Sequence, residues 1–173
     1  MQIIHEIDVD GPTHGRIEAL RNDACPEYAV ARSYYKQLPH LRALQFDGAD
    51  LVGTMGLDYR AMAVGDAVVK ILGVIDFCVA AHARGQGIGS TMLRALIAYA
   101  TARNVDFVIL MADDPRLYAR HGFQRVEAHA SWLRIHEHKS YGIAFAHIDD
   151  LYVKQIGDKA WPDGHVDWLG YMF

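Results

Sequence analysis

The sequence predicts a mixed α/β fold of the α+β type, with a mostly antiparallel central sheet, one parallel strand–helix–strand unit and helices on both faces. Residues 74–102 have the pattern of a buried strand, a glycine-rich turn and an amphipathic helix. The run DFVILM at 106–111 is continuously apolar, as in a strand buried on both faces, and completes the parallel unit. The apolar runs 51–64 and 67–80 are separated by Gly65-Asp66, which predicts an antiparallel hairpin.

Length and composition indicate one soluble globular domain spanning residues 1–173. Hydrophobic residues make up 51% of the chain and charged residues 22%, which is ordinary for this class. The net charge of −4 argues against a nucleic-acid partner. We expect no membrane partner, because no apolar run approaches the roughly 20 residues of a membrane span. Cys25 and Cys78 are the only cysteines and no signal-peptide pattern is present, so a cytoplasmic location is expected. A homodimer is left open.

The N-terminal part alternates between strand and helix patterns. Residues 3–9 are expected to form a strand, because their apolar residues alternate and turn formers follow them; residues 41–46 are expected to form a strand that ends at a turn. Residues 13–21 are expected to form a short helix, since Ile17 and Leu20 share one face. Residues 27–38 are expected to form a second helix, ended by a proline.

The C-terminal part predicts a short helix and two strands. Asp114 suits a helix cap, Pro115 the first helical position, and Gly122 the residue after the helix. The last two strands are expected at 126–135 and 141–153. The tail beyond residue 160 is rich in turn formers and aromatic residues.

The turn between Arg84 and Gly89 has the properties of an anion site. Its three glycines at alternate positions let the backbone approach a ligand without obstruction by a Cβ atom. The first amides of the following helix have no intrahelical partner and lie at the positive end of the helix dipole. A phosphate is the ligand most often bound in this way, and Arg84 would add a cation at the rim.

Two common phosphate motifs do not fit the turn. The dinucleotide fingerprint requires a third glycine where Met92 stands, and the P-loop requires a Gly-Lys pair that the chain lacks. The remaining pattern, R-G-Q-G-I-G after a strand ending F-C-V, resembles the signature of the GNAT superfamily of N-acetyltransferases. An ordinary glycine-rich connection is the alternative.

The resemblance implies that acetyl-coenzyme A is bound here, with its pyrophosphate on the amides of the turn and helix. It also implies that the strand backbone binds the pantetheine arm and the acyl carbonyl. The coenzyme-binding residues implied in this stretch are Phe77, Cys78, Val79, Arg84, Gly85, Gln86, Gly87, Ile88, Gly89 and Ser90.

A second motif resembles the Y-x-x-x-G-F element of the same family. It begins at Tyr118 and ends at Phe123, and the resemblance implies that Tyr118 is the general acid. A phenol has a pKa of about 10 and can donate a proton or hydrogen bond to the leaving thiolate. Packing of the ring on the protein is the alternative. Where some members have an asparagine this chain has Met111, so Asp113 or Asp114 is expected to contact the coenzyme instead, with Asp114 preferred.

A protonated amine cannot attack the thioester, so a general base or a water chain is needed. The family reaction is a direct attack without an acyl-enzyme. Asp76 is the first candidate, because a charge in an apolar strand is costly unless it is paired or functional. A polar partner on a neighbouring strand is the alternative. Glu127 and His129 are weaker candidates, and Cys78 lacks a base beside it in sequence and is expected to be structural.

The acceptor side is the least explicit in the sequence. In the GNAT family the first helical region borders the acceptor pocket, which suggests Tyr28 as a contact; packing of the tyrosine against the sheet is the alternative. In the tail, Trp161-Pro162-x-Gly164 is followed by Val166-Asp167, and this pattern resembles the endings of aminoglycoside 2′-N-acetyltransferases and of nodulation N-acyltransferases. That resemblance implies that Trp161 or Trp168 stacks on a sugar, while Asp167 and the terminal carboxylate of Phe173 hold an amino group. The alternative is that the tail covers a sheet edge.

These observations predict transfer of an acetyl group from acetyl-coenzyme A to a primary amine of a small molecule. An amino sugar or aminoglycoside-like acceptor is slightly favoured. A catalytically silent coenzyme A sensor or scaffold and an acetyltransferase of protein or peptide amines are the alternatives. No metal is expected, because His136 and His138 alone do not form a metal site.

Overall fold

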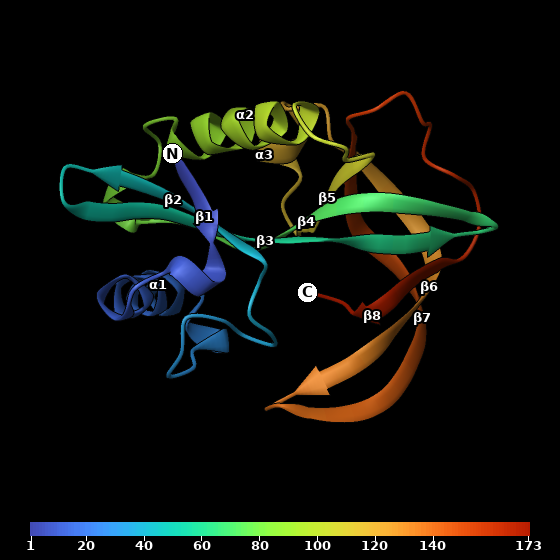
Figure 1. Ribbon diagram of the computed structural model, residues 1–173, viewed down its shortest axis with the longest axis horizontal. Helices are drawn as coiled ribbons and strands as arrows, with labels where there is room; N and C mark the ends of the chain where they lie inside the picture. The colour runs from blue at the N-terminus through green and yellow to red at the C-terminus, as the bar shows by residue number, and fades with distance from the viewer. The chain divides into compact units, whose positions relative to one another are not determined.

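The computed structural model describes residues 1–173, which form a mixed sheet of eight strands with three α-helices (Figure 1). Its residues cluster into two compact units. The first unit contains Met1–Asp58 and Val74–Leu96, and the second contains Tyr59–Gly73 and Ile97–Phe173. The mixed sheet confirms the predicted fold class, whereas a single domain over 1–173 stays a prediction.

In the first unit the strand order is β1-β2-β3-β4, and the β1–β2 and β2–β3 pairs are antiparallel. The strands concerned are β1 (Gln2–His5), β2 (Leu41–Asp47), β3 (Asp50–Val64) and β4 (Ala67–Val79), of which β3 and β4 continue into the second unit. The helices that begin in this unit are α1 (Gly11–Ala24) and α2 (Ile88–Thr101), with three single turns η1 (Glu6–Asp8), η2 (Pro26–Tyr28) and η3 (Ala81–Ala83).

Helices cover both faces of the sheet in the first unit. Leu20 of α1 packs in one buried cluster with Val52 of β3. A Cβ atom on the next residue, Gly53, would lie 2.5 Å from the sulfur of Met92 in α2. Because successive residues of a strand point to opposite faces, α1 and α2 lie on opposite sides of β3.

The second unit contains six strands whose hydrogen bonding closes on itself. The further elements are β5 (Phe107–Met111), α3 (Arg116–Ala119), β6 (Gln124–His136), β7 (Lys139–Gln155) and β8 (Val166–Tyr171). Strand β4 pairs in parallel with β5 through Ile71–Gly73 and Phe107–Ile109, which confirms the predicted parallel unit. The strand order is β3-β4-β5-β7-β6-β8, and β8 also pairs with β3. Every strand of this unit therefore has two neighbours.

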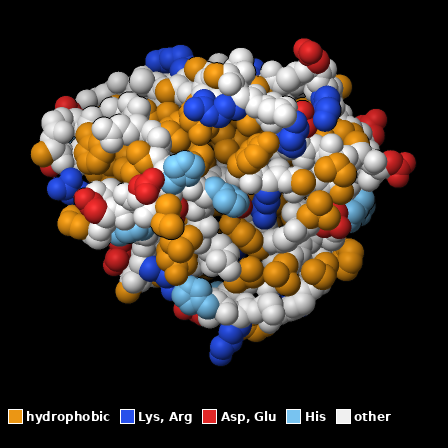
Figure 2. Space-filling view, in the orientation of Figure 1, with side chains coloured by type: hydrophobic (Ala, Val, Ile, Leu, Met, Phe, Trp, Pro, Cys, Tyr) orange, Lys and Arg blue, Asp and Glu red, His pale blue; other side chains and the backbone are white.

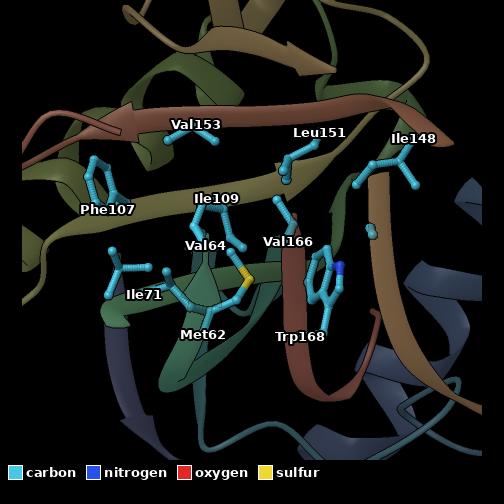
Figure 3. Packing of buried hydrophobic residues seen from close by; sticks show 12 residues of the cluster. Met62, Val64, Ile71, Phe107, Ile109, Ile148, Leu151, Val153, Val166 and Trp168 are labelled. Atoms are coloured by element: carbon cyan, nitrogen blue, oxygen red, sulfur yellow. The ribbon is translucent and has the colours of Figure 1, made fainter. Parts of the chain in front are cut away.

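The interior of these six strands is filled by apolar side chains (Figure 3). Met62, Ile71, Phe107 and Trp168 are each fully buried there. Figure 3 shows that they come from different strands and converge on one core. Residues far apart in the sequence are thus held together mainly by burial of apolar surface.

The predicted helix at 27–38 is wrong. Only η2 is helical there, and the following residues form bends without a helix or strand. Side chains take the backbone hydrogen bonds that a helix would have made: the Asn22 amide donates to the carbonyl of Val30 at 2.9 Å and accepts from its N–H at 3.2 Å. The helical propensity of this segment is overridden here by hydrogen bonds from side chains to the backbone.

The elements near both ends of the chain also differ from the prediction. The strand expected at 3–9 ends at His5, because η1 begins at Glu6. The tail contains an additional strand, β8, which was not predicted because turn-forming residues surround it in the sequence. It confirms the alternative that the tail covers a sheet edge, since it pairs with both β3 and β6.

Removing the Trp168 side chain is expected to destabilise the protein strongly. The residue is 0% exposed, and truncating a buried tryptophan to alanine typically costs about 3–5 kcal/mol. The free energy of unfolding of Trp168→Ala should be measured in urea beside that of Leu169→Ala, whose side chain is 58% exposed. Equal unfolding midpoints for the two variants would contradict this packing.

Candidate active site

The glycine-rich turn follows β4 and η3 and leads into α2. Gly85 and Gly87 have φ angles of 75° and 80°, a left-handed conformation that glycine adopts at low cost. A Cβ atom added to either residue would meet no atom within 4 Å. The turn therefore exposes its backbone to open space, as a ligand cradle requires.

Helix α2 begins with amides suited to an anion. The N–H of Thr91 donates to the carbonyl of Gly87 at 2.9 Å, so the N–H groups of the preceding helical residues, 88–90, lie in the unpaired first turn. No acidic residue occurs in that turn. The positive end of the helix dipole is thus not neutralised by a side chain of the helix itself.

Two side chains of the turn brace its backbone. The Arg84 Nε donates to the carbonyl of Val79 at 3.0 Å, and the Gln86 amide donates to the carbonyl of His82 at 3.0 Å. Arg84 is exposed, and it is held at the end of β4. This geometry ties the Arg84 guanidinium to the end of β4, and its contact with a phosphate stays a prediction.

Asp76 lies on β4 directly before the predicted coenzyme-binding strand residues. Its φ of 47° is unusual for a residue other than glycine and marks a local irregularity of the strand. One carboxylate oxygen accepts a hydrogen bond from the Arg21 Nε at 2.9 Å. The polar partner therefore comes from α1 and not from a neighbouring strand, while a role of Asp76 as base stays a prediction.

Arg21 is the residue at this site that the sequence interpretation missed. It is 1% exposed, and its terminal nitrogens both donate to the carbonyl of Tyr28 at 3.0 Å. Its guanidinium also lies 5.3 Å from the ring centre of Tyr35, which contacts the Tyr28 ring edge-on at 5.5 Å. The signal in the sequence was its position four residues after Ile17, on the buried face of the helix.

Cys78 is buried next to α1 and does not have the properties of a nucleophile. Burial, with a further contribution from nearby Cys25, raises the pKa of its thiol to about 12. The thiol is therefore neutral at physiological pH, whereas the thiolate is the reactive form. This supports the expected structural role.

Cys78 is expected to resist alkylation in the folded protein. Since the thiolate reacts and the pKa is about 12, the labelled fraction should stay low at pH 8 and rise only in strongly alkaline solution. Iodoacetamide labelling followed by peptide mass mapping measures this, with labelling in urea as the control for both cysteines. Rapid labelling of Cys78 in the folded state at pH 8 would contradict the burial of the thiol.

Tyr118 lies in the second unit on the single turn of α3. Its ring contacts the ring of Phe123 at 5.9 Å and the ring of Tyr152 at 6.2 Å between centres. Gly122, with φ 76°, reverses the chain so that Phe123 returns to the buried side. The Y-x-x-x-G-F spacing therefore serves to fix the orientation of the Tyr118 ring.

Asp114 is bound to its own neighbour. Its carboxylate accepts from the Arg116 backbone at 3.0 Å and from the Arg116 guanidinium at 2.7–3.0 Å. The Arg116 side chain lowers the pKa of Asp114 to about 2, so the carboxylate is ionised at physiological pH. Its oxygens have donors already, and its contact with the coenzyme stays a prediction.

The two weaker candidates for the base lie on β6. Glu127 is exposed and lies 3.6 Å from Arg125, and the ring of His129 contacts the ring of His147 at 5.5 Å.

No group of three or more His, Cys, Asp or Glu side chains in the structure is arranged to hold a metal ion. Figure 2 shows apolar side chains gathered in several groups on one face, with basic, acidic and histidine side chains between and around them.

The tail residues predicted to bind the acceptor are mostly packed in the second unit. Trp168 has no exposed ring face, so its predicted stacking on a sugar is wrong for this conformation. Trp161 is half-buried and contacts Phe107 edge-on at 5.1 Å. Asp167 is half-buried and accepts from the Leu169 N–H at 3.0 Å. Trp161 and Trp168, which the sequence suggested as ligand contacts, pack instead in or against the hydrophobic core.

A central strand that leads through a glycine-rich turn to a helix N-terminus defines a class of proteins that bind phosphate-containing ligands. A family model described as an acetyltransferase (GNAT) domain matches residues 24–126, which is more than half of the chain. The chain belongs to the GNAT acetyltransferase family. None of the curated proteins matches it significantly.

Solved structures share the fold. The GNAT family N-acetyltransferase YhbS of Escherichia coli in complex with CoA is 17% identical, with a TM-score of 0.63 over 96% of this chain and 88% of that one. A GNAT family acetyltransferase of Brucella melitensis in complex with acetyl-CoA is 16% identical, with a TM-score of 0.62 over 95% and 93%. A probable N-acyltransferase of Enterococcus faecalis is 12% identical, with a TM-score of 0.60 over 75% of this chain; this chain spans about a third (33%) of its length.

The helices of the structure are also too short or too polar to cross a lipid bilayer.

Proposed function

We propose that the protein transfers the acetyl group of acetyl-coenzyme A to a primary amine of a small molecule. The observation that carries the proposal is the open glycine-rich turn at the N-terminus of α2. The E. coli and B. melitensis structures, which share the fold, contain CoA and acetyl-CoA. The residues of the turn fit this ligand, because they offer unobstructed amides and no competing carboxylate.

The donor site is formed by β4, the turn and α2. Amides at the start of α2 bind the pyrophosphate, and Arg84 adds a positive charge beside them. Main-chain groups of Phe77–Val79 bind the pantetheine arm, and these residues lie beyond the three residue pairs that join β4 to β5. The neutral thiol of Cys78 supports direct transfer without an acyl-enzyme.

The reaction requires two proton transfers. The nitrogen lone pair of the acceptor attacks the thioester carbonyl carbon, the C–N bond forms and the C–S bond breaks. Tyr118 donates a proton or hydrogen bond to the leaving sulfur, and packing against Phe123 and Tyr152 restricts its ring. A base takes the proton of the amine; Asp76 is our first candidate, with Glu127 and His129 after it.

For the acceptor we propose only a chemical class, a primary amine of a small molecule. Tyr28, with 52% of its surface exposed, offers an aromatic face next to the donor strand in the first unit. Because Trp168 is buried and Trp161 packs on Phe107, the tail no longer favours an amino sugar over other primary amines.

The test is release of coenzyme A thiol from acetyl-coenzyme A across a panel of amines. The panel contains an aminoglycoside, an amino sugar, a polyamine, an amino acid and a peptide with a free N-terminus. Turnover with small-molecule amines supports the proposal, and turnover with the peptide alone replaces it by a protein acetyltransferase. Tight coenzyme binding without any thiol release would make the protein a sensor or scaffold.

A further inference from the structure

We propose that Arg21 is a positioning residue of the acceptor site. It links the acceptor loop, residues 26–40, which contains Tyr28, to Asp76 on the donor strand β4. The inference rests on the proposed function and names a residue that sets acceptor recognition. One guanidinium makes both connections: its Nε binds Asp76 at 2.9 Å and its terminal nitrogens bind the Tyr28 carbonyl at 3.0 Å.

The loop needs such a tie because it has no regular structure of its own. Residues 26–40 contain no strand and only the single turn η2, so the loop cannot satisfy most of its backbone groups through a hydrogen-bond ladder. Three buried or half-buried side chains do so from outside: Arg21 at Tyr28, Asn22 at Val30 and Arg42 at Ser33. Ordering a loop costs conformational entropy at every residue, so loss of one tie should loosen the segment around it.

Arg21 differs from Asn22 and Arg42 in the residue that it binds outside the loop. Asp76 is the residue with the left-handed φ on β4, and Phe77–Val79 of the proposed donor site follow it directly. Arg42 instead pairs with Glu6, next to β1, at 2.6 Å. Arg21 therefore fixes the acceptor loop relative to the donor strand, whereas Arg42 fixes the loop relative to the edge of the sheet.

The position requires arginine because of the geometry of its side chain. The planar guanidinium donates in three directions at once, to Asp76, to Asn22 and to the Tyr28 carbonyl. It also places a flat cation beside the Tyr35 ring, whose edge-on contact orients the exposed Tyr28 ring. A lysine ammonium keeps the charge but cannot reach these partners as a fork.

The first experiment compares Arg21→Lys with Arg42→Lys as a matched control, since both arginines are 1% exposed and bind a carboxylate and a loop carbonyl. Arg21→Lys should raise the acceptor KM by about tenfold or more, as loss of charge-assisted hydrogen bonds predicts. The affinity for acetyl-coenzyme A should change less than about twofold, because the turn and α2 are untouched. Arg42→Lys should lower the unfolding midpoint without this split between acceptor KM and coenzyme affinity.

A second measurement tests the coupling itself. In a double-mutant cycle of Arg21→Gln and Asp76→Asn, the two increases in amide exchange of residues 26–38 should not add, because either change breaks the same link. This readout does not depend on turnover, which Asp76→Asn would lower if Asp76 is the base. Independent addition of the two effects, or an unchanged acceptor KM in Arg21→Lys, would overturn the proposal.

Hydrogen exchange separates failure of the inference from failure of the proposed function. Amide exchange of residues 26–38 should speed up in Arg21→Lys whether or not the protein transfers acetyl groups. If no amine is acetylated but this exchange rises, the proposed reaction fails while the tie stands. Unchanged exchange in that loop refutes the positioning role directly, even in a fully active enzyme.

Discussion

Replacing Gly87 with valine is expected to abolish the binding of acetyl-coenzyme A while the protein stays folded. At the φ of 80° a side chain with a Cβ atom is strained by about 1–2 kcal/mol, which a folded domain can tolerate. The new side chain would enter the open space in front of the turn, where no protein atom lies within 4 Å. That space is where the amides have to meet the pyrophosphate.

Gly142→Val is the matched control for backbone strain. Gly142 has φ 77° and also has no atom within 4 Å of its Cβ position, but it lies on β7 and outside the turn. Calorimetric titration with coenzyme A should show binding for the Gly142 variant and none for the Gly87 variant. If a folded Gly87→Val protein binds the coenzyme with normal affinity, the turn is not the donor site.

Tyr118→Phe is expected to lower kcat by about 10²- to 10⁴-fold, the usual contribution of a general acid. The substitution keeps the ring and its contacts with Phe123 and Tyr152, and removes only the phenolic hydroxyl. Coenzyme affinity and thermal stability should change little. Turnover should be measured at saturating acetyl-coenzyme A with the best amine of the panel.

Tyr152→Phe provides the comparison, because it removes a phenolic hydroxyl from the ring that contacts Tyr118. Tyr152 is buried and has no proposed chemical role, so its kcat should stay within about threefold of the unmodified enzyme. Normal turnover in Tyr118→Phe would assign Tyr118 to packing alone.

The sequence by itself determined the parts of the protein that depend on neighbouring residues. The strand, glycine turn and α2 could be recognised because their periodicity and glycine positions lie within one continuous stretch of the chain. The short motif from Tyr118 to Phe123 is local in the same way: Gly122 reverses the chain and Phe123 packs on Tyr118. Both motifs can therefore be recognised without knowledge of the tertiary structure around them.

Only the tertiary structure decided which partners meet across long distances in the sequence. Arg21 and Asp76 are 55 residues apart, and neither residue indicates the other in a single sequence. The same holds for Trp168. In an exposed tail this residue would have been available to a ligand. Because β8 pairs with β3 and β6, Trp168 lies instead in the core. Burial of a large aromatic ring and of a paired charge depends on the whole arrangement of strands, because each gains its stability only from groups that folding brings to it.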